Sequence, residues 1–262
     1  MIYIRLIEIQ DYNDKVYFLP LGDLHLGEKN IDVEKFEGYL NWALKEKAYI
    51  FLMGDLFDVA TLNSPTLVWG QQMSLNNALQ SLFEKLKPLK SQVLGSISGN
   101  HEQRLIRYAN FDPVQTLCQM LEVPYCGFSA VLRFRIGLHR IGLNRHPNIE
   151  YVFYAHHSTG GGSTLGGKLN RVAKLDEIFE GADAYLAGHN HSKALGEKSL
   201  AYLSKNGRGE AQLKYKRVMY VDTGSFILYD GSYAEEKMLP PSDTGAVRIR
   251  MNGIKKDLHV SY

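Results

Sequence analysis

The stretch Gly99-Asn100-His101-Glu102 follows the apolar run Val93-Leu94-Gly95-Ser96-Ile97, with only Ser98 between them. An apolar run of this length that stops at a glycine predicts a buried strand ending in a polar turn. The amide of Asn100 offers a metal-binding oxygen, and the imidazole of His101 offers a proton donor. An isolated Asn-His pair is more often an ordinary turn, because such side chains bond their own backbone.

The same design recurs at four other places in the chain. Apolar runs end at Gly22-Asp23-Leu24-His25, at Gly54-Asp55-Leu56-Phe57-Asp58, at His156 and at Gly188-His189-Asn190-His191. Five strand ends that carry one kind of chemistry predict one shared site rather than five unrelated turns.

The order of apolar patterns predicts the fold class. The first half alternates strand, helix and strand, and includes Asp112 as the N-cap of a helix with Pro113 at its first position. Hairpin-like alternation follows between residues 129 and 144, Asn170 is expected to cap a later helix, and the tail is again strand-like. These patterns favour a four-layer α/β/β/α sandwich of two mixed β-sheets flanked by helices. Without a linker or repeat, residues 1–262 are expected to form a single domain.

The composition is that of an ordinary globular protein. Of the 262 residues, 45% are hydrophobic and 22% are charged, and the net charge is only +2, so no global field implies a nucleic-acid partner. The two cysteines, Cys118 and Cys126, do not suggest a disulfide framework. No run approaches the roughly 18 apolar residues of a membrane span, and the start lacks a leader pattern. We therefore expect a cytoplasmic protein without membrane contact.

The candidate site residues are metal ligands by type. Asp23 and His25, like His189 and His191, are two residues apart, so an extended backbone would point both members of each pair to one side. Carboxylates, an amide and imidazoles without any thiolate favour Mn²⁺, Fe or Zn²⁺ over a cysteine-type zinc site. Seven such groups exceed one tetrahedral ion and suit two ions, with Asp55 as the best candidate for a bridging carboxylate.

The ordered motifs between residues 22 and 191 resemble the calcineurin-like metallophosphoesterase superfamily. The resemblance implies two divalent ions, with Mn²⁺ expected and Fe, Zn²⁺ or Ni²⁺ as alternatives. It assigns Asp23, His25 and His191 to one ion, Asn100, His156 and His189 to the other, and Asp55 to both. His156 is chosen over His157 because the family ligand directly follows the apolar strand. His157 is then a turn residue or a substrate-binding residue.

The resemblance also assigns the catalytic roles. Metal-activated hydroxide would attack phosphorus in line, and His101 would protonate the leaving oxygen. Asp58 matches the family carboxylate that orients this histidine, although capping of the following turn is an equally good role. Arg104 is a candidate substrate-binding residue that clamps phosphate, with a solvated helix charge as the alternative.

Two further features stay open at this level. The Gly160–Gly167 loop could cradle phosphate, act as a lid or simply connect two elements. The basic residues Lys168, Arg171 and Lys174 are three apart and could follow a nucleic-acid backbone, although such stripes are usually solvated.

Residues next to the motifs narrow the expected class of substrate. Val59-Ala60 stands where Ser/Thr protein phosphatases of the superfamily have Arg-Gly. The motif Gly-Asp-Leu-Phe-Asp is similar to that of the DNA-repair exonuclease branch. The C-terminal segment resembles that of small phage and prophage phosphoesterases. We expect a phosphodiesterase acting on DNA, other nucleic acid or nucleotides. The sequence does not fix the oligomeric state, and a homodimer is one option. The alternatives are a phosphomonoesterase or protein phosphatase, and a non-catalytic protein-binding scaffold of the same fold.

Overall fold

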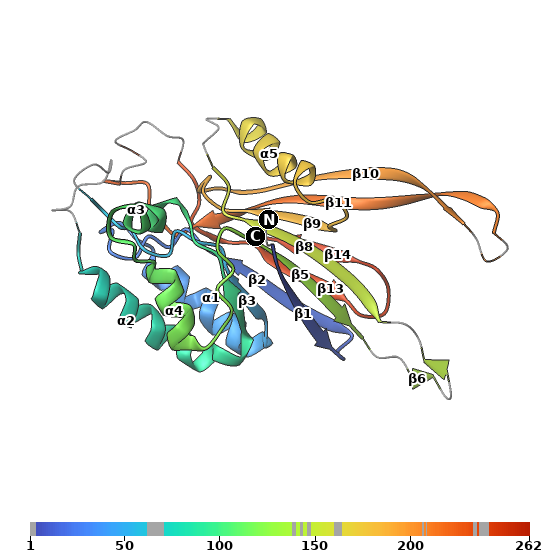
Figure 1. Cartoon of the computed structure of the whole chain (residues 1–262), viewed down its shortest axis with the longest axis horizontal. Helices are drawn as coiled ribbons and strands as arrows, with labels where there is room; N and C mark the ends of the chain where they lie inside the picture. Colours follow the sequence, from blue (N-terminus) through green and yellow to red (C-terminus); the bar gives the residue numbers. More distant parts are fainter. Residues whose placement is uncertain are drawn as a thin grey trace.

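Two β-sheets form the centre of the protein, and helices cover both outer faces (Figure 1). The computed structural model describes residues 4–61, 71–137, 140–141, 144–145, 148–159, 164–205, 207, 209–232, 235 and 241–262. The two mixed sheets and the flanking helices confirm the predicted α/β/β/α sandwich. No helix among these residues is long and apolar enough to cross a membrane.

The five-stranded sheet positions three of the motifs. Its strands, in spatial order, are β14 (Leu258–Ser261), β13 (Arg248–Asn252), β2 (Lys15–Leu21), β3 (Tyr49–Leu52) and β4 (Val93–Ser96). The last three are parallel, and their register sets Leu21 opposite Leu52 and Leu52 opposite Ser96. The turns that follow them therefore begin at one edge of the sheet and at nearly the same level.

The seven-stranded sheet positions the remaining motifs. Its strands, in spatial order, are β1 (Arg5–Asp11), β5 (Ser129–Ile136), β8 (Ile149–His156), β9 (Ala184–Ala187), β11 (Ala211–Ser225) and β10 (Lys193–Lys205), and β12 (Gly245–Ala246) pairs with β11. β8 and β9 are parallel, with His156 opposite Ala187, so their following turns are neighbours. The hairpin of β10 and β11 extends beyond the body (Figure 1). A separate two-stranded sheet joins β6 (Arg140–Ile141) and β7 (Asn144–Arg145).

Alternation along the strands divides the core into layers. Leu19 and Leu21 of β2 face the helices, whereas Phe18 packs between the sheets against Phe134 and Phe153. The helices are α1 (Val33–Glu46), α2 (Leu75–Leu86), α3 (Asn100–Ala109), α4 (Pro113–Leu121) and α5 (Leu165–Ala173), with 3₁₀ segments at Lys87–Gln92 and Lys174–Glu177. α1, α2 and α4 cover the five-stranded sheet, and α5 covers the seven-stranded sheet.

Helix starts agree with the sequence in one case and not in another. The Asp112 side chain accepts from the backbone N–H groups of Val114 and Gln115, which confirms the predicted cap of α4. The prediction that Asn170 caps α5 is wrong, because the helix begins at Leu165 and the Thr164 hydroxyl is its cap. Residues 160–163 of the predicted glycine loop lie outside the described residues.

Candidate metal centre

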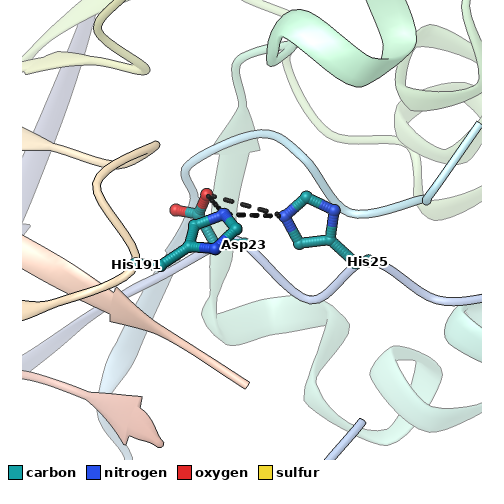
Figure 2. A group of neighbouring side chains, drawn as sticks. All are labelled: Asp23, His25 and His191. Carbon is teal, nitrogen blue, oxygen red and sulfur yellow. Dashed lines mark hydrogen bonds and ion pairs between the residues drawn. The ribbon is translucent and has the colours of Figure 1, made fainter. Parts of the chain in front are cut away.

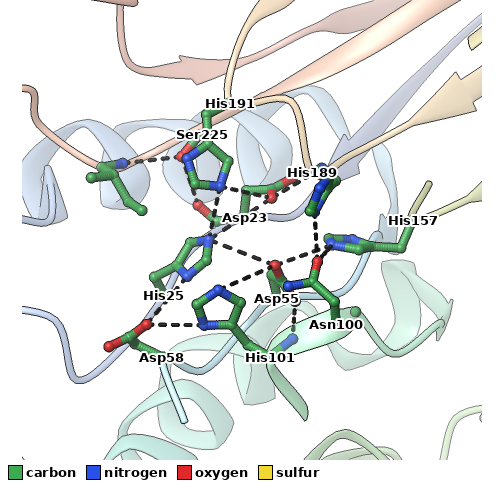
Figure 3. A network of polar contacts seen from close by, with 12 residues as sticks. Asp23, His25, Asp55, Asp58, Asn100, His101, His157, His189, His191 and Ser225 are labelled. Carbon is green, nitrogen blue, oxygen red and sulfur yellow. Dashed lines mark hydrogen bonds and ion pairs between the residues drawn. The ribbon is translucent and has the colours of Figure 1, made fainter. Parts of the chain in front are cut away.

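The turns after β2, β3, β4, β8 and β9 bring the predicted polar side chains together (Figure 3). The turn residues of β2 and β3 are tied to each other, since the Asp23 N–H donates to the Gly54 carbonyl and the His25 N–H to the Asp55 carbonyl, each at 3.0 Å. The backbone here is not extended as expected: Asp23 and His25 have left-handed φ values of 50° and 49°. A tight turn, rather than strand alternation, therefore directs both side chains into the site.

One group of possible ligands consists of Asp23, His25 and His191 (Figure 2). The two imidazole Nε2 atoms lie 3.1 Å apart. Asp23 Oδ1 lies 3.4 Å from Nε2 of His191 and 3.8 Å from Nε2 of His25. Two ring nitrogens and a carboxylate oxygen that converge in this way require a cation or a proton between them. All three residues were predicted to hold the same ion.

The second group consists of Asp55, Asn100, His157 and His189 (Figure 3). His157 Nε2 lies 3.1 Å from Asp55 Oδ2 and 3.2 Å from Asn100 Oδ1. His189 Nδ1 lies 2.6 Å from the same amide oxygen. Oxygen and imidazole nitrogen donors again face one point.

Asp55 belongs to both groups. Its Oδ1 accepts from the His101 N–H at 2.8 Å, whereas its Oδ2 lies 3.1 Å from His157 Nε2 and 3.9 Å from His25 Nε2. This Oδ2 atom is buried and has no hydrogen-bond partner in the described part of the chain. A buried carboxylate oxygen without a donor is costly unless a ligand binds it. The donor set and this orphaned oxygen fit two divalent ions that share one carboxylate.

The structure places His157, and not the expected His156, in the cluster. β8 continues through His156, whose Nδ1 accepts from the Ser158 N–H at 2.7 Å. His157 is buried, and its Nδ1 donates to the Met53 carbonyl at 2.7 Å, which fixes Nε2 toward Asp55. The error arose because the strand is one polar residue longer than the apolar run. His157 is therefore a candidate ligand rather than a turn or substrate residue.

Charges around the site favour a bound cation. Burial disfavours charge on the imidazoles, yet the neighbouring carboxylates raise the pKa of both His25 and His157 to about 10. Burial also opposes charge on Asp55, but the adjacent imidazoles hold its pKa well below the usual value. Protons on these rings balance the buried carboxylates. A divalent cation would displace them, since metal binding releases protons from its ligands.

His101 lies beside both groups and contacts two further polar side chains. Its Nδ1 lies 3.0 Å from Asp58 Oδ1, and Gln71 donates to Oδ2 of the same carboxylate at 2.7 Å. Arg104 Nη2 lies 3.1 Å from His101 Nε2. A guanidinium has no acceptor, so Nε2 accepts in this contact and Nδ1 carries the ring proton toward Asp58. The structure thus brings the predicted pair of His101 and Asp58 into contact.

Glu102 supports the turns of the site, a role that the sequence did not reveal. Its buried carboxylate accepts from the backbone N–H groups of Leu56, Gly99, Asp55 and Phe57, at 2.7, 2.8, 3.1 and 3.1 Å. Burial and the charge of Asp55 raise its pKa to about 7, against the effect of these hydrogen bonds. Glu102 joins the turns after β3 and β4. Its position three residues after the N-cap Gly99, as in a capping box, could have revealed it.

The predicted basic stripe has a structural role at two of its three positions. Lys168 donates to the Asn190 carbonyl at 2.9 Å, and Arg171 donates to the Thr159 carbonyl at 3.1 Å. Both side chains brace loops that carry site residues. They give no geometric support for a nucleic-acid track along α5.

Comparison with known proteins identifies the family of this chain. The family model for calcineurin-like phosphoesterases matches residues 17–193, and no curated protein matches the chain. The solved structure of the phosphoesterase Yfce from E. coli is 12% identical, has a TM-score of 0.42, and aligns over 90% of this chain and 88% of its own. GAP50, the anchor in the inner membrane complex of Plasmodium, is 11% identical, has a TM-score of 0.48, and aligns over 92% of this chain and 82% of its own. Vps29 of Chaetomium thermophilum is 10% identical, has a TM-score of 0.42, and aligns over 95% of this chain and 96% of its own. Because the family model spans more than half of its residues, the chain belongs to the calcineurin-like phosphoesterase family.

Proposed function

We propose that this protein is a metal-dependent phosphodiesterase that hydrolyses a diester bond of nucleic acid or of a nucleotide. The observation that carries the proposal is the unpartnered Oδ2 of Asp55, which lies between two sets of nitrogen and oxygen donors. A carboxylate in this place suits two ions held side by side. Such a pair of ions is suited to a substrate whose reacting group is anionic.

The ligands divide between the two ions by position. One ion would be held by Asp23, His25 and His191, the other by Asn100, His157 and His189, and Asp55 would serve both. The donor set lacks thiolate and combines imidazoles with carboxylates, which suits Mn²⁺, Fe, Zn²⁺ or Ni²⁺, and of these we propose Mn²⁺. Ions bound here supply Lewis acidity and positive charge toward a phosphate.

His101 is suited to protonate the leaving oxygen. Its Nδ1 lies 3.0 Å from Asp58 Oδ1, so Nε2 is the ring nitrogen that is available to a substrate. In the substrate-free protein this nitrogen accepts from Arg104. A phosphate that draws the guanidinium away frees Nε2 to take up a proton and to deliver it to the leaving oxygen. Asp58 stabilises the imidazolium that exists between these two steps.

Diester hydrolysis is favoured over the alternatives by particular residues. Val59-Ala60 stands where a protein phosphatase of the superfamily would have Arg-Gly, which argues against a protein phosphatase. A scaffold that had lost activity would be expected to lack ligands, whereas here seven donor residues and His101 are present. These observations support an enzyme that acts on diesters.

The test compares two chromogenic substrates with Mn²⁺ present. We expect hydrolysis of bis(p-nitrophenyl) phosphate to exceed that of p-nitrophenyl phosphate.

Asp55→Asn should bind less metal, measured by elemental mass spectrometry, because the shared charge is lost. His101→Ala should keep its metal but lower kcat about 10²- to 10⁴-fold, the usual range for a lost general acid. A preference for the monoester would indicate a phosphomonoesterase, and hydrolysis of neither substrate would indicate a scaffold.

A further inference from the structure

One face of α3 extends from His101 away from the metal centre. Residues three, four or seven positions apart share a helix face, so His101, Arg104 and Tyr108 are aligned along it. The contact between Arg104 Nη2 and His101 Nε2 confirms the alignment of the first two. Tyr108 is 66% exposed, one turn beyond Arg104. A guanidinium and an aromatic ring therefore follow the histidine in order.

Arg104 has the features of a residue that awaits an anion. Its Nη1 is buried and has no hydrogen-bond partner, and no carboxylate lies within ion-pair distance of its guanidinium, in both cases counting only the described residues. A half-buried guanidinium is costly when its donors lack acceptors. Paired N–H donors of this kind are well matched to phosphate oxygens. The neighbouring arginine on the helix, Arg107, is exposed instead, so its guanidinium is solvated.

The position of Arg104 in the site indicates which half of the substrate it would contact. If His101 protonates the leaving oxygen, as in the proposed function on which this step rests, the leaving group lies on the α3 side. A group that contacts Arg104 is then attached to the leaving half. Beyond it, the exposed ring of Tyr108 offers a surface on which a base can stack, as aromatic side chains do with single-stranded nucleic acids.

We infer that this face of α3 is a subsite for a leaving nucleotide. Arg104 binds the phosphate that follows the leaving nucleoside, and Tyr108 stacks on its base. The subsite distinguishes an oligonucleotide from a simple diester, because only an oligonucleotide carries a second phosphate on the leaving side. The reacting bond is the same in both, and water adds to phosphorus as the leaving oxygen takes a proton.

The test uses three thymidine dinucleotides: one without a terminal phosphate, one with a 5′ phosphate and one with a 3′ phosphate. Wild-type protein with Mn²⁺ should hydrolyse one of the phosphorylated forms with a kcat/KM at least tenfold above that of the unphosphorylated form. The products show which nucleoside leaves, and the favoured phosphate must be on it. Arg104→Ala should bring this ratio close to one, and the matched control Arg107→Ala should keep it. Tyr108→Ala should raise KM for the dinucleotides, and Tyr108→Phe should not.

Two outcomes overturn the inference without touching the proposed function. Equal kcat/KM for all three dinucleotides in the wild type would mean that no second phosphate is bound. An unchanged ratio in Arg104→Ala, with a wild-type melting temperature, would mean that another residue binds it. Absence of hydrolysis of any diester by the wild type would instead reject the proposed function itself.

Discussion

At the scale of single residues, the metal centre depends on backbone conformations that most side chains avoid. Five of the seven candidate ligands have φ values between 47° and 72°: Asp23, His25, Asp55, His189 and His191. Asp and His adopt this left-handed region more readily than other non-glycine residues, but it still costs of order 1 kcal/mol each. Hydrogen bonds between the turns offset that cost, as where the His189 N–H donates to Asp23 at 3.0 Å. The strained backbone of these turns is therefore what allows the side chains to converge.

The correction from His156 to His157 gives a prediction at the same scale. His157→Ala removes a nitrogen that lies 3.1 Å from the shared carboxylate, so we expect it to lower metal content and to reduce diester hydrolysis about 100-fold, the upper end of the usual range. His156→Ala removes only a contact to the Ser158 N–H. It should retain its metal and most of its activity. Elemental analysis and kcat/KM of the two variants measure this, and equal losses in both would contradict the assignment.

At the scale of elements, the sequence predicted strands and their order well but their ends less well. The apolar runs before Gly22, Gly54 and Gly188 correspond to β2, β3 and β9, and Asp112 caps α4 as expected. These features follow from local hydrophobic patterns and caps. The last residue of β8 could not be predicted, because His156 pairs with Ser129 through its backbone, which no side-chain pattern reveals.

Hydrogen bonds between residues far apart in the chain could not be predicted from the sequence either. The link from Glu102 to the turn after β3 spans more than 40 residues, and it depends on the two turns lying side by side. Likewise, the roles of Lys168 and Arg171 depend on which carbonyl groups lie near them in space. A basic stripe and a braced loop have the same sequence pattern. Only the fold separates them.

The Glu102 link leads to a prediction about how two elements are joined. In Glu102→Gln one carboxylate oxygen becomes an NH₂ group, which faces backbone donors instead of accepting from them. We expect the free energy of unfolding of the metal-free protein to fall by about 2–4 kcal/mol, since buried donors lose their acceptor. Urea denaturation measures the loss. Glu122→Gln is the control because that side chain is 77% exposed, and it should change stability little.

At the scale of the whole molecule, the candidate metal centre lies where the two sheets meet, at one edge of their shared core. The five-stranded sheet supplies Asp23, Asp55 and Asn100, whereas the seven-stranded sheet supplies His157, His189 and His191. Between the sheets the contacts are apolar, with Phe18 packed 5.3 Å from Phe134 and 5.2 Å from Phe153, measured between ring centroids. Apolar packing holds the sheets together without fixing how their polar edges meet. Ions shared by both edges would fix it.

Metal removal should therefore loosen both sheets together. A ligand that binds only the folded protein stabilises it by about 2.7 kcal/mol when its free concentration is 100 times its Kd, so the melting temperature should rise with Mn²⁺ and fall with chelator. In hydrogen exchange with mass spectrometry, chelation should speed exchange at the turns 22–25, 54–58 and 99–102 of one sheet and at the turn 188–191 of the other. Asp55→Asn lacks the carboxylate that lies near nitrogens from both sheets, so its exchange should respond little to Mn²⁺. Faster exchange in the turns of only one sheet would show that the ions do not connect the two.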